Sequence, residues 1–182
     1  MTFHYFAYGS NMLPARLIDR CRTARLVGTG IAPNFRLEFS KASKDGSGKA
    51  TLAPAPGARL PGVIFEIDDS ERAVLDRREG LDSGYRRDDG FVVKGIVHGN
   101  TFLTSTYLGT SSNAQLKPFD WYLATVIAGA THHGMDETHI TALRGIIFIE
   151  DIETNRTTRV AALKAMQDHS IGDYRMLLKN PR

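Results

Sequence analysis

The chain has 182 residues, of which 42% are hydrophobic and 24% are charged, with a formal net charge of +3. This composition and length suit one soluble domain with its own core, and no apolar run is long enough to cross a bilayer. Acidic residues are interspersed with the basic ones, and no linker divides the sequence, which argues against a nucleic-acid-binding protein and for a single domain over residues 1–182.

The first part of the chain is dominated by strand-like segments. Residues 4–8 suit a buried strand, and Leu13, Leu17 and Ile18 then recur at helical spacing, with Pro14 tolerated in the first helical turn. Strands are expected at 25–31, 35–40, 50–53 and 60–67, with a polar loop at 41–48. The Pro-Ala-Pro-Gly stretch at 54–57 is expected to be a rigid loop.

A helix is expected over residues 71–79. The Asp-Asp-Ser sequence at 68–70 supplies capping side chains, Val74 and Leu75 face inward, and Gly80 closes the helix. Apolar and polar residues alternate in 91–98 and in 101–108, which predicts the two strands of a hairpin. Gly99-Asn100 between them is suited to a type II′ turn.

Helical patterns dominate the last third of the chain. Residues 118–130 and 136–143 are expected to be helices, with Trp121, Val126 and Ile127 in the core, and 160–167 to be a last amphipathic helix. Regular strand-helix alternation is missing, so we expect an α+β fold: a small mixed β-barrel with flanking short helices. The chain from about residue 150 is expected to be a helical C-terminal extension of this domain.

The turn Tyr8-Gly9-Ser10-Asn11 is the strongest candidate for a binding site. Gly9 lets a ligand approach the main chain, while Ser10 and Asn11 add short polar groups beside bare N–H donors. These features predict a cradle for a small anion. The alternative is a turn that merely leads the chain out of a strand.

Two motifs in order resemble the γ-glutamylcyclotransferase-like family. Residues 5–12, Tyr-Phe-Ala-Tyr-Gly-Ser-Asn-Met, resemble its Tyr-Gly-Ser-Asn turn after the first strand. Residues 75–80, Leu-Asp-Arg-Arg-Glu-Gly, followed by Ser83-Gly84-Tyr85, resemble its catalytic Glu-Gly pair at a helix end. Four further segments also occur in the order that the family has them, so the resemblance covers most of residues 5–143. They are residues 48–52, 62–67 and 105–108 and the helix bearing Tyr122.

The resemblance implies a barrel with flanking helices and an enzyme that turns γ-glutamyl amines into 5-oxoproline and a released amine. In that reaction the substrate's own α-amine attacks its side-chain carbonyl, so the nucleophile belongs to the substrate. One carboxylate can serve both proton transfers, a contribution of about 10²- to 10⁴-fold, and binding the substrate in a bent form adds a proximity effect. We therefore expect no serine-histidine pair, reactive cysteine, metal or cofactor.

Glu79 is the expected general acid/base. A carboxylate at a helix C-terminus lies at the negative end of the helix dipole, which favours its holding a proton. The alternative is an exposed helix glutamate paired with Arg77, Arg78 or Arg86.

The other expected site residues hold the γ-glutamyl head. Main-chain N–H groups of the turn meet its α-carboxylate. For each tyrosine the alternative is a core ring with its hydroxyl at the surface. The expected substrate-binding residues are Tyr5, Tyr8, Gly9, Ser10, Asn11, Tyr85 and Tyr122.

The histidine-rich segment near residue 135 has no recognised metal-ligand spacing, because Gly134 interrupts it. No metal site is expected there. His4 is expected on a strand surface, and Cys21, the single cysteine, as an inert packing residue. The potential ligands in that segment are His132, His133, Asp136, Glu137 and His139.

The amino terminus lacks the pattern of a secretory signal, so a cytoplasmic location is expected. Two clusters of basic residues are interpreted either as charged faces exposed to solvent or as surfaces that attract an anionic small molecule. The clusters are Arg16, Arg20, Arg22 and Arg25, and Arg77, Arg78, Arg86 and Arg87.

The expected partner is a small γ-glutamyl molecule, with neither nucleic acid nor membrane. γ-Glutamyl amino acids or amides of a biosynthetic route are favoured over glutathione, since the resemblance is to a turn that differs from that of glutathione-degrading cyclotransferases. A non-catalytic ligand-binding or interaction domain with the same fold is the main alternative, and a basic nucleic-acid-binding protein is the other. The oligomeric state, a homodimer included, stays open.

Overall fold

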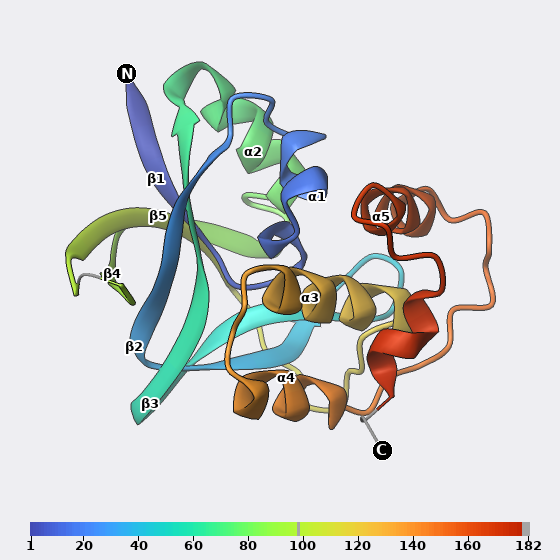
Figure 1. Ribbon diagram of the computed structural model, residues 1–182. Helices are drawn as coiled ribbons and strands as arrows, with labels where there is room; N and C mark the ends of the chain where they lie inside the picture. The colour runs from blue at the N-terminus through green and yellow to red at the C-terminus, as the bar shows by residue number, and fades with distance from the viewer. Residues whose placement is uncertain (98, 180–182) are drawn as a thin grey trace.

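The computed structural model describes residues 1–97 and 99–179, and its strands close into a barrel in the order β1-β3-β2-β4-β5 (Figure 1). β1 pairs with β5 in parallel at Tyr5 and Ser105, and the other neighbours are antiparallel. The expected mixed barrel of an α+β fold is confirmed. The strands are β1 (Thr2–Ala7), β2 (Arg25–Ala42), β3 (Gly48–Asp68), β4 (Tyr85–Gly95) and β5 (Thr101–Gly109).

β2 and β3 are longer than expected, because each joins two segments that the sequence suggested were separate. The rigid loop expected at 54–57 is wrong: these residues form an irregularity inside β3, where the register passes from Pro33 opposite Arg59 to Phe35 opposite Pro54. Asn34 lies across from it with a φ of 63°, and its Oδ1 accepts the Gly57 N–H at 2.9 Å. This part of β3 pairs with β2 alone, which tolerates proline on the unpaired edge.

The β4–β5 hairpin also differs from the sequence expectation. β4 begins at Tyr85 and ends at Gly95, so the link to β5 is longer than a two-residue turn. Gly99 has a φ of 66°, in the left-handed region that favours glycine. The strand end expected at residue 98 lies outside the described residues.

The helices agree well with the sequence patterns. Asp68 Oδ1 accepts the Ser70 N–H at 2.8 Å where the capping sequence was expected, and Gly80 closes α2 with a φ of 78°. Short 3-10 turns precede α1 and α2 and follow α5. The helical elements are η1 (Ser10–Met12), α1 (Pro14–Ile18), η2 (Asp69–Glu71), α2 (Arg72–Glu79), α3 (Asp120–His132), α4 (Glu137–Arg144), α5 (Thr157–Gln167) and η3 (Tyr174–Leu178).

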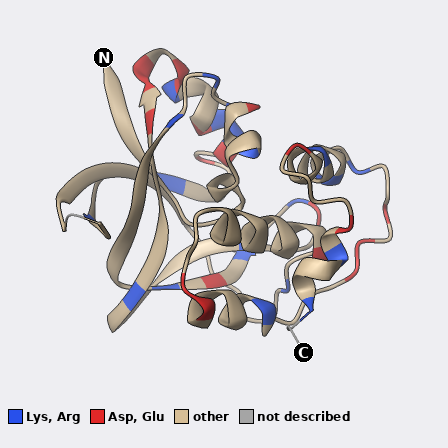
Figure 2. Cartoon of the chain, viewed as in Figure 1, with Lys and Arg blue, Asp and Glu red and all other residues tan. Residues whose placement is uncertain are grey.

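α3 is the central helix of the fold and is nearly free of charge (Figure 2). Trp121, Val126 and Ile127 are buried, as expected. Gly129 lets this helix lie close to the turn after β1, since a Cβ there would come within 2.7 Å of Met12 Cβ. The turn is therefore held against a rigid, buried support.

The C-terminal segment covers α3. Tyr174 Oη donates to Asp120 Oδ2 at 2.7 Å, and Trp121 Nε1 donates to Asp151 Oδ2 at 2.8 Å. Arg159 Nη1 donates to the Asp151 carbonyl at 2.6 Å. The first two bonds tie residues beyond 150 to the helix that supports the site, and the third holds α5 to the loop before it. Among the described residues, no helix combines the length and apolarity that a bilayer crossing requires.

Cys21 is buried where α1 leads back towards the barrel, consistent with the packing role expected for it. Burial raises the pKa of its thiol to about 11, so the reactive thiolate is disfavoured near neutral pH.

Candidate active site

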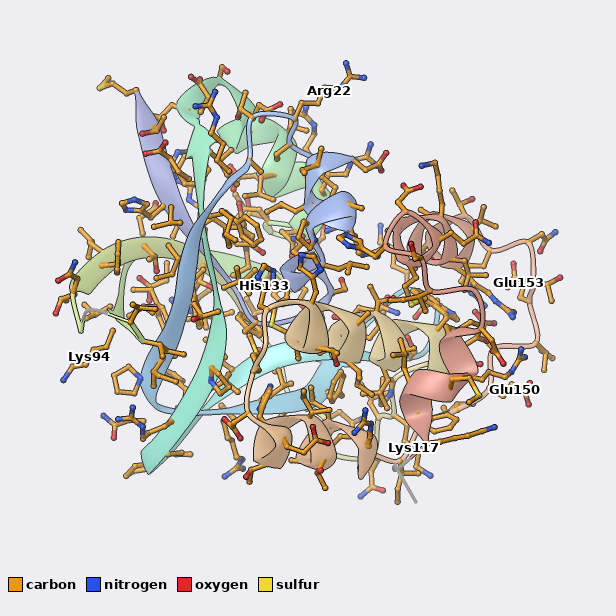
Figure 3. All side chains as sticks on the ribbon, in the orientation of Figure 1. Arg22, Lys94, Lys117, His133, Glu150 and Glu153 are labelled. Carbon is orange, nitrogen blue, oxygen red and sulfur yellow. The ribbon has the colours of Figure 1, made fainter. Side chains whose placement is uncertain are left out.

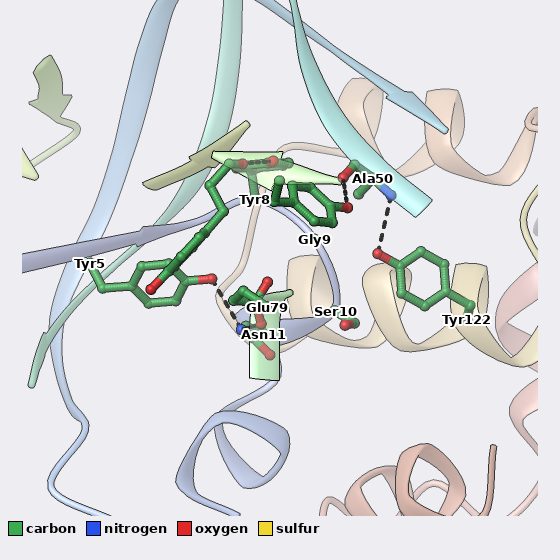
Figure 4. A pocket seen from close by; sticks show the side chains of 10 residues that line it. Tyr5, Tyr8, Gly9, Ser10, Asn11, Ala50, Glu79 and Tyr122 are labelled. Carbon is green, nitrogen blue, oxygen red and sulfur yellow. Dashed lines mark hydrogen bonds between the residues drawn. The ribbon is translucent and has the colours of Figure 1, made fainter. Parts of the chain in front are cut away.

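The turn after β1 and the C-terminal end of α2 meet at one small pocket (Figure 4). All eight residues expected from the sequence line it, although they come from four separate parts of the chain. Ala50 and Tyr107 line it as well. The full lining is Tyr5, Tyr8, Gly9, Ser10, Asn11, Ala50, Glu79, Tyr85, Tyr107 and Tyr122.

The space around Gly9 is tight, and its φ is not positive. Its φ is −116°, which other residues also adopt. A Cβ at this position would lie 3.1 Å from Ala50 Cβ and 3.5 Å from Tyr122 Oη. Any side chain here would crowd the pocket wall, so the glycine keeps the main chain open to a ligand.

The turn presents main-chain donors without acceptors. Met12 N–H donates to the Gly9 carbonyl at 3.0 Å and Leu13 N–H to the Ser10 carbonyl at 3.3 Å, which forms the 3-10 turn. Within the described residues, the N–H groups of Gly9, Ser10 and Asn11 make no hydrogen bond. Free donors at such a turn are suited to a carboxylate or another small anion.

Glu79 ends α2 with its side chain only 17% exposed. Its Oε1 accepts from Asn11 Nδ2 at 2.8 Å and from Arg20 Nη1 at 2.5 Å. The suggested pairing with Arg77, Arg78 or Arg86 does not occur, because the α1 side of the fold brings Arg20 to this carboxylate instead. Oε2 makes no hydrogen bond with the described residues, so one oxygen is left to exchange a proton.

Asn11 connects the acid to the first strand. Its Nδ2 donates both to Glu79 Oε1 and to Tyr5 Oη, the latter at 3.0 Å. Its Oδ1 is buried and has no partner among the described residues, an arrangement that is costly unless a ligand supplies a donor. The amide thus fixes the carboxylate and offers one acceptor.

The four expected tyrosines are buried, and their hydroxyls bond inside the protein, which contradicts the alternative of hydroxyls at the surface. Tyr8 Oη donates to the Tyr107 carbonyl, and Tyr85 Oη to the Ala50 carbonyl at 2.6 Å. Tyr122 Oη accepts the Ala50 N–H at 3.2 Å.

The hydroxyls consequently divide into two kinds. The hydroxyls of Tyr5 and Tyr122 accept a hydrogen bond from the protein, and their own hydrogens remain free to donate. The hydroxyls of Tyr8 and Tyr85 already donate to main-chain carbonyls. Burial raises the pKa of all four phenols above the usual value, so they stay protonated. The pocket therefore has two free hydroxyl donors and two hydroxyl acceptors.

Three site residues were missed in the sequence: Arg20, Ala50 and Tyr107. Tyr107 Oη donates to Asp76 Oδ1 at 2.7 Å, and Asp76 is paired with Arg87 at 2.6 Å, so this ring is fixed from β4 and α2. The only available signal was its place in the segment 105–108. Arg20 lies four residues after Arg16 and beyond the end of α1, and no local pattern indicates that it reaches Glu79.

A wider groove opens outside the pocket. Ser10, Glu79, Tyr85 and Tyr122 line both spaces, so the two are continuous. The groove has an empty volume of about 1600 Å³, open solvent included, against about 310 Å³ for the pocket. Glu153, on the loop before α5 (Figure 3), is one of the residues that line it. The charged lining is Arg16, Arg20, Lys41, Lys44, Asp45, Lys49, Arg77, Arg78, Glu79, Glu153 and Arg156.

The histidines have structural contacts. His133 Nε2 lies 2.9 Å from the Met12 carbonyl, and His169 Nε2 accepts the Ala15 N–H at 3.2 Å. Asp136 caps α4 through the His139 N–H at 2.9 Å, and the His4 ring packs edge-on against Phe102. In the part of the chain that the structure describes, no group of three or more His, Cys, Asp or Glu side chains is placed to hold a metal ion.

Known proteins resemble this chain in sequence and in fold. Residues 59–143 match the model of the AIG2-like family. Gamma-glutamylcyclotransferase of Mus musculus is 29% identical over 154 residues, which is 80% of this chain and 79% of the mouse protein. The Homo sapiens protein of that name is 28% identical over the same shares. A solved structure named gamma-glutamyl cyclotransferase has a TM-score of 0.81 and 25% identity, covering 90% of this chain and 99% of its own.

Proposed function

We propose that the chain, which is similar to gamma-glutamylcyclotransferases in sequence and in fold, is an enzyme that converts a γ-glutamyl amino acid or amide to 5-oxoproline and a free amine. The observation that carries this proposal is the position of Glu79. Its carboxylate is fixed through one oxygen and free at the other, at a pocket whose facing wall is a turn with free N–H donors.

The γ-glutamyl head fits the pocket by charge and by hydrogen bonding. The N–H groups of Gly9, Ser10 and Asn11 receive its α-carboxylate. Tyr5 and Tyr122 can donate to an oxygen of the substrate, while Asn11 Oδ1 and the hydroxyl of Tyr8 or Tyr85 can accept from its α-amine. The pocket thus offers donors for the anionic end of an amino acid and acceptors for its nitrogen.

The reaction requires one proton carrier and no external reactant. The substrate's α-amine attacks its own side-chain carbonyl carbon, which closes a five-membered ring. Glu79 Oε2 takes a proton from the attacking nitrogen and delivers it to the leaving nitrogen as the amide C–N bond breaks. No water is consumed, and the enzyme ends in its starting protonation state.

Two hydrogen bonds fix the Glu79 side chain before the reaction. Arg20 Nη1 and Asn11 Nδ2 both donate to Oε1, at 2.5 and 2.8 Å. The general-base step therefore starts from a carboxylate whose orientation is fixed. A non-catalytic binding domain would have no need for a fixed carboxylate with a free oxygen, which favours the enzyme over that alternative.

A panel assay tests the proposed function. The protein is incubated with γ-glutamyl amino acids and γ-glutamyl amides, and 5-oxoproline is measured by mass spectrometry. The matched control is the α-glutamyl isomer of each substrate. In that isomer the amide is formed by the α-carboxyl group, so attack of the α-amine on its carbonyl carbon would not close a five-membered ring. We expect product from at least one γ-linked compound and none from its isomer, and product from neither would overturn the proposal.

We place this reaction in the cytoplasm, with a small molecule as the partner. The nucleic-acid alternative makes a different prediction: binding to nucleic acid that falls steeply as salt rises. Retention of the protein on a nucleic-acid column at 0.15 M salt, of the order of physiological ionic strength, would support that alternative.

A further inference from the structure

We propose that the groove outside the pocket binds the leaving amine through a far end that carries at least two negative charges, either a phosphate or a pair of carboxylates. This inference rests on the proposed function and specifies its substrate class. Glu79, Ser10, Tyr85 and Tyr122 border both spaces, so a γ-glutamyl head in the pocket directs the rest of the substrate into the groove.

The groove has an excess of positive charge. Its lining contains eight Lys and Arg side chains and three carboxylates. Each of the three carboxylates already has a cationic partner: Glu79 has Arg20, Asp45 has Lys49, and Glu153 has Arg156. Within the described residues, five cations have no carboxylate within 4.0 Å: Arg16, Lys41, Lys44, Arg77 and Arg78.

Arg16 is a nearly buried cation on the α1 side of the groove. The residue is 6% exposed, and its Nε donates to Ser10 Oγ at 3.0 Å. Its two terminal nitrogens make no hydrogen bond with the described residues, and Arg16 lines the groove. Burial, and next the nearby charge of Arg20, lower the pKa of Arg16 to about 9. Holding this charge without a counter-ion is costly, and an anion would relieve the cost.

Lys41 is the matching cation from the end of β2. It is 8% exposed, and its Nζ lies 4.5 Å from the centroid of the Tyr85 ring, which also lines the pocket. Burial lowers the pKa of its ammonium. Gly84 leaves the room for this side chain, since a Cβ there would lie 2.7 Å from Lys41 Cε.

The two buried cations come from different elements and border the pocket mouth through different residues, Ser10 and Tyr85. A single carboxylate next to the scissile nitrogen would neutralise only one of them. A phosphate, or two carboxylates, would neutralise both, with the more exposed Lys44, Arg77 and Arg78 adding longer-range attraction. The charge pattern thus favours a doubly charged leaving amine.

Binding is measured with desamino analogues, in which a glutaryl group replaces the γ-glutamyl group. These compounds lack the attacking amine and cannot react, so calorimetry can be done on the native protein. Glutaryl-aminoethyl phosphate is compared with glutaryl-ethanolamide, and glutaryl-glutamate with glutaryl-glutamine. The first pair tests phosphate and the second tests the added carboxylate, so the two sources of charge are distinguished.

We expect the doubly charged member of at least one pair to bind at least tenfold more tightly at low salt. Arg16→Gln and Lys41→Gln should each reduce that preference at least fivefold. Lys94→Gln, on the opposite side of the molecule from Glu153 (Figure 3), should leave it unchanged. Preferences within threefold for both pairs, or equal effects of all three variants, would overturn the inference.

Turnover of the corresponding γ-glutamyl compounds separates the two proposals. Release of 5-oxoproline without a binding preference for charge would overturn the groove assignment alone. A binding preference that depends on Arg16 or Lys41, without release of 5-oxoproline from any compound, would overturn the proposed reaction alone. Thermal unfolding shows whether Arg16→Gln has a folding defect. If it has one, the binding preference of Lys41→Gln alone tests the groove assignment.

Discussion

Asn11 Nδ2 donates to Glu79 Oε1 at 2.8 Å, which joins the turn after β1 to the end of α2 across 68 residues of sequence. The same nitrogen also donates to Tyr5 Oη at 3.0 Å. A single amide therefore sets the position of the proposed proton carrier relative to the strand that begins the site. The neighbouring N–H groups belong to the same turn, so the acid and the anion cradle are positioned together.

Asn11→Ala removes this link. We expect kcat/KM to fall about 10²-fold, since the carboxylate loses its orientation relative to the substrate. Removing a buried amide that bonds a charged group should also lower the free energy of unfolding by about 1–3 kcal/mol. Steady-state kinetics and denaturant unfolding measure the two effects. Asn113→Ala, at an exposed position, is the matched control, and equal kinetics in the two variants would contradict the role given to Asn11.

Gly9→Ala tests the close approach at the turn. The new methyl group would lie 3.1 Å from Ala50 Cβ and 3.5 Å from Tyr122 Oη, so either the pocket narrows or its wall moves. We expect KM to rise about tenfold, a loss of about 1.4 kcal/mol of substrate binding. Gly172→Ala is the control, because a Cβ there meets no atom within 4 Å. An unchanged KM for Gly9→Ala would show that the substrate does not approach this turn.

Tyr122→Phe tests the free hydroxyl donor. The variant loses both the acceptor of the Ala50 N–H and the hydrogen that we assign to the substrate. KM should rise by about tenfold, with a smaller change in kcat. Tyr174→Phe removes another buried hydroxyl, bonded to Asp120 at 2.7 Å and distant in sequence from the pocket residues. It should lower the melting temperature without changing KM, and a matching rise in KM would argue for a general packing effect.

His133 gives the stability a dependence on pH. Burial lowers the pKa of its imidazole below the usual 6.5, and its Nε2 is the donor to the Met12 carbonyl because a carbonyl oxygen only accepts. The unfolded chain therefore takes up the proton first, and stability is lost as the pH falls through 6.5 towards the lower folded value.

The test of this dependence is denaturant unfolding at pH 7.5 and at pH 5, of the order of one unit on either side of the usual histidine pKa. His133→Gln keeps a donor for the carbonyl but does not titrate. Its free energy of unfolding should fall less between the two pH values than that of the parent protein. An identical fall in both proteins would show that His133 does not contribute.

Local patterns in the sequence predicted the elements that position the site. The capping sequence at 68–70 and Gly80 defined the helix that ends at Glu79, and the Tyr-Gly-Ser-Asn turn marked the facing wall. These features could be predicted because capping, left-handed glycine and turn chemistry depend on a few neighbouring residues. The roles assigned to them stay predictions until the variants are measured.

Other features depend on contacts between distant segments. Arg20 reaches Glu79 only because the fold brings the turn after α1 to the end of α2, and Tyr107 enters the pocket only because β5 closes the barrel against β1. The irregular pairing of Asn34 with Gly57 likewise allows β2 and β3 to continue through proline-containing stretches that look like breaks. Apart from the place of Tyr107 in the segment 105–108, none of these contacts has a signal within a short window of sequence.

The most direct test of the central claim is the single-turnover release of 5-oxoproline by Glu79→Gln, using the best γ-glutamyl substrate of the panel. Glutamine keeps the shape of the side chain but cannot carry the proton between the two nitrogens. We predict a fall of about 10²- to 10⁴-fold in the rate of release, with substrate binding retained. Glu150→Gln, at an exposed carboxylate bonded to Arg175, should react at the parent rate. Equal rates for Glu79→Gln and the parent protein would contradict the assignment of Glu79 as the general acid/base.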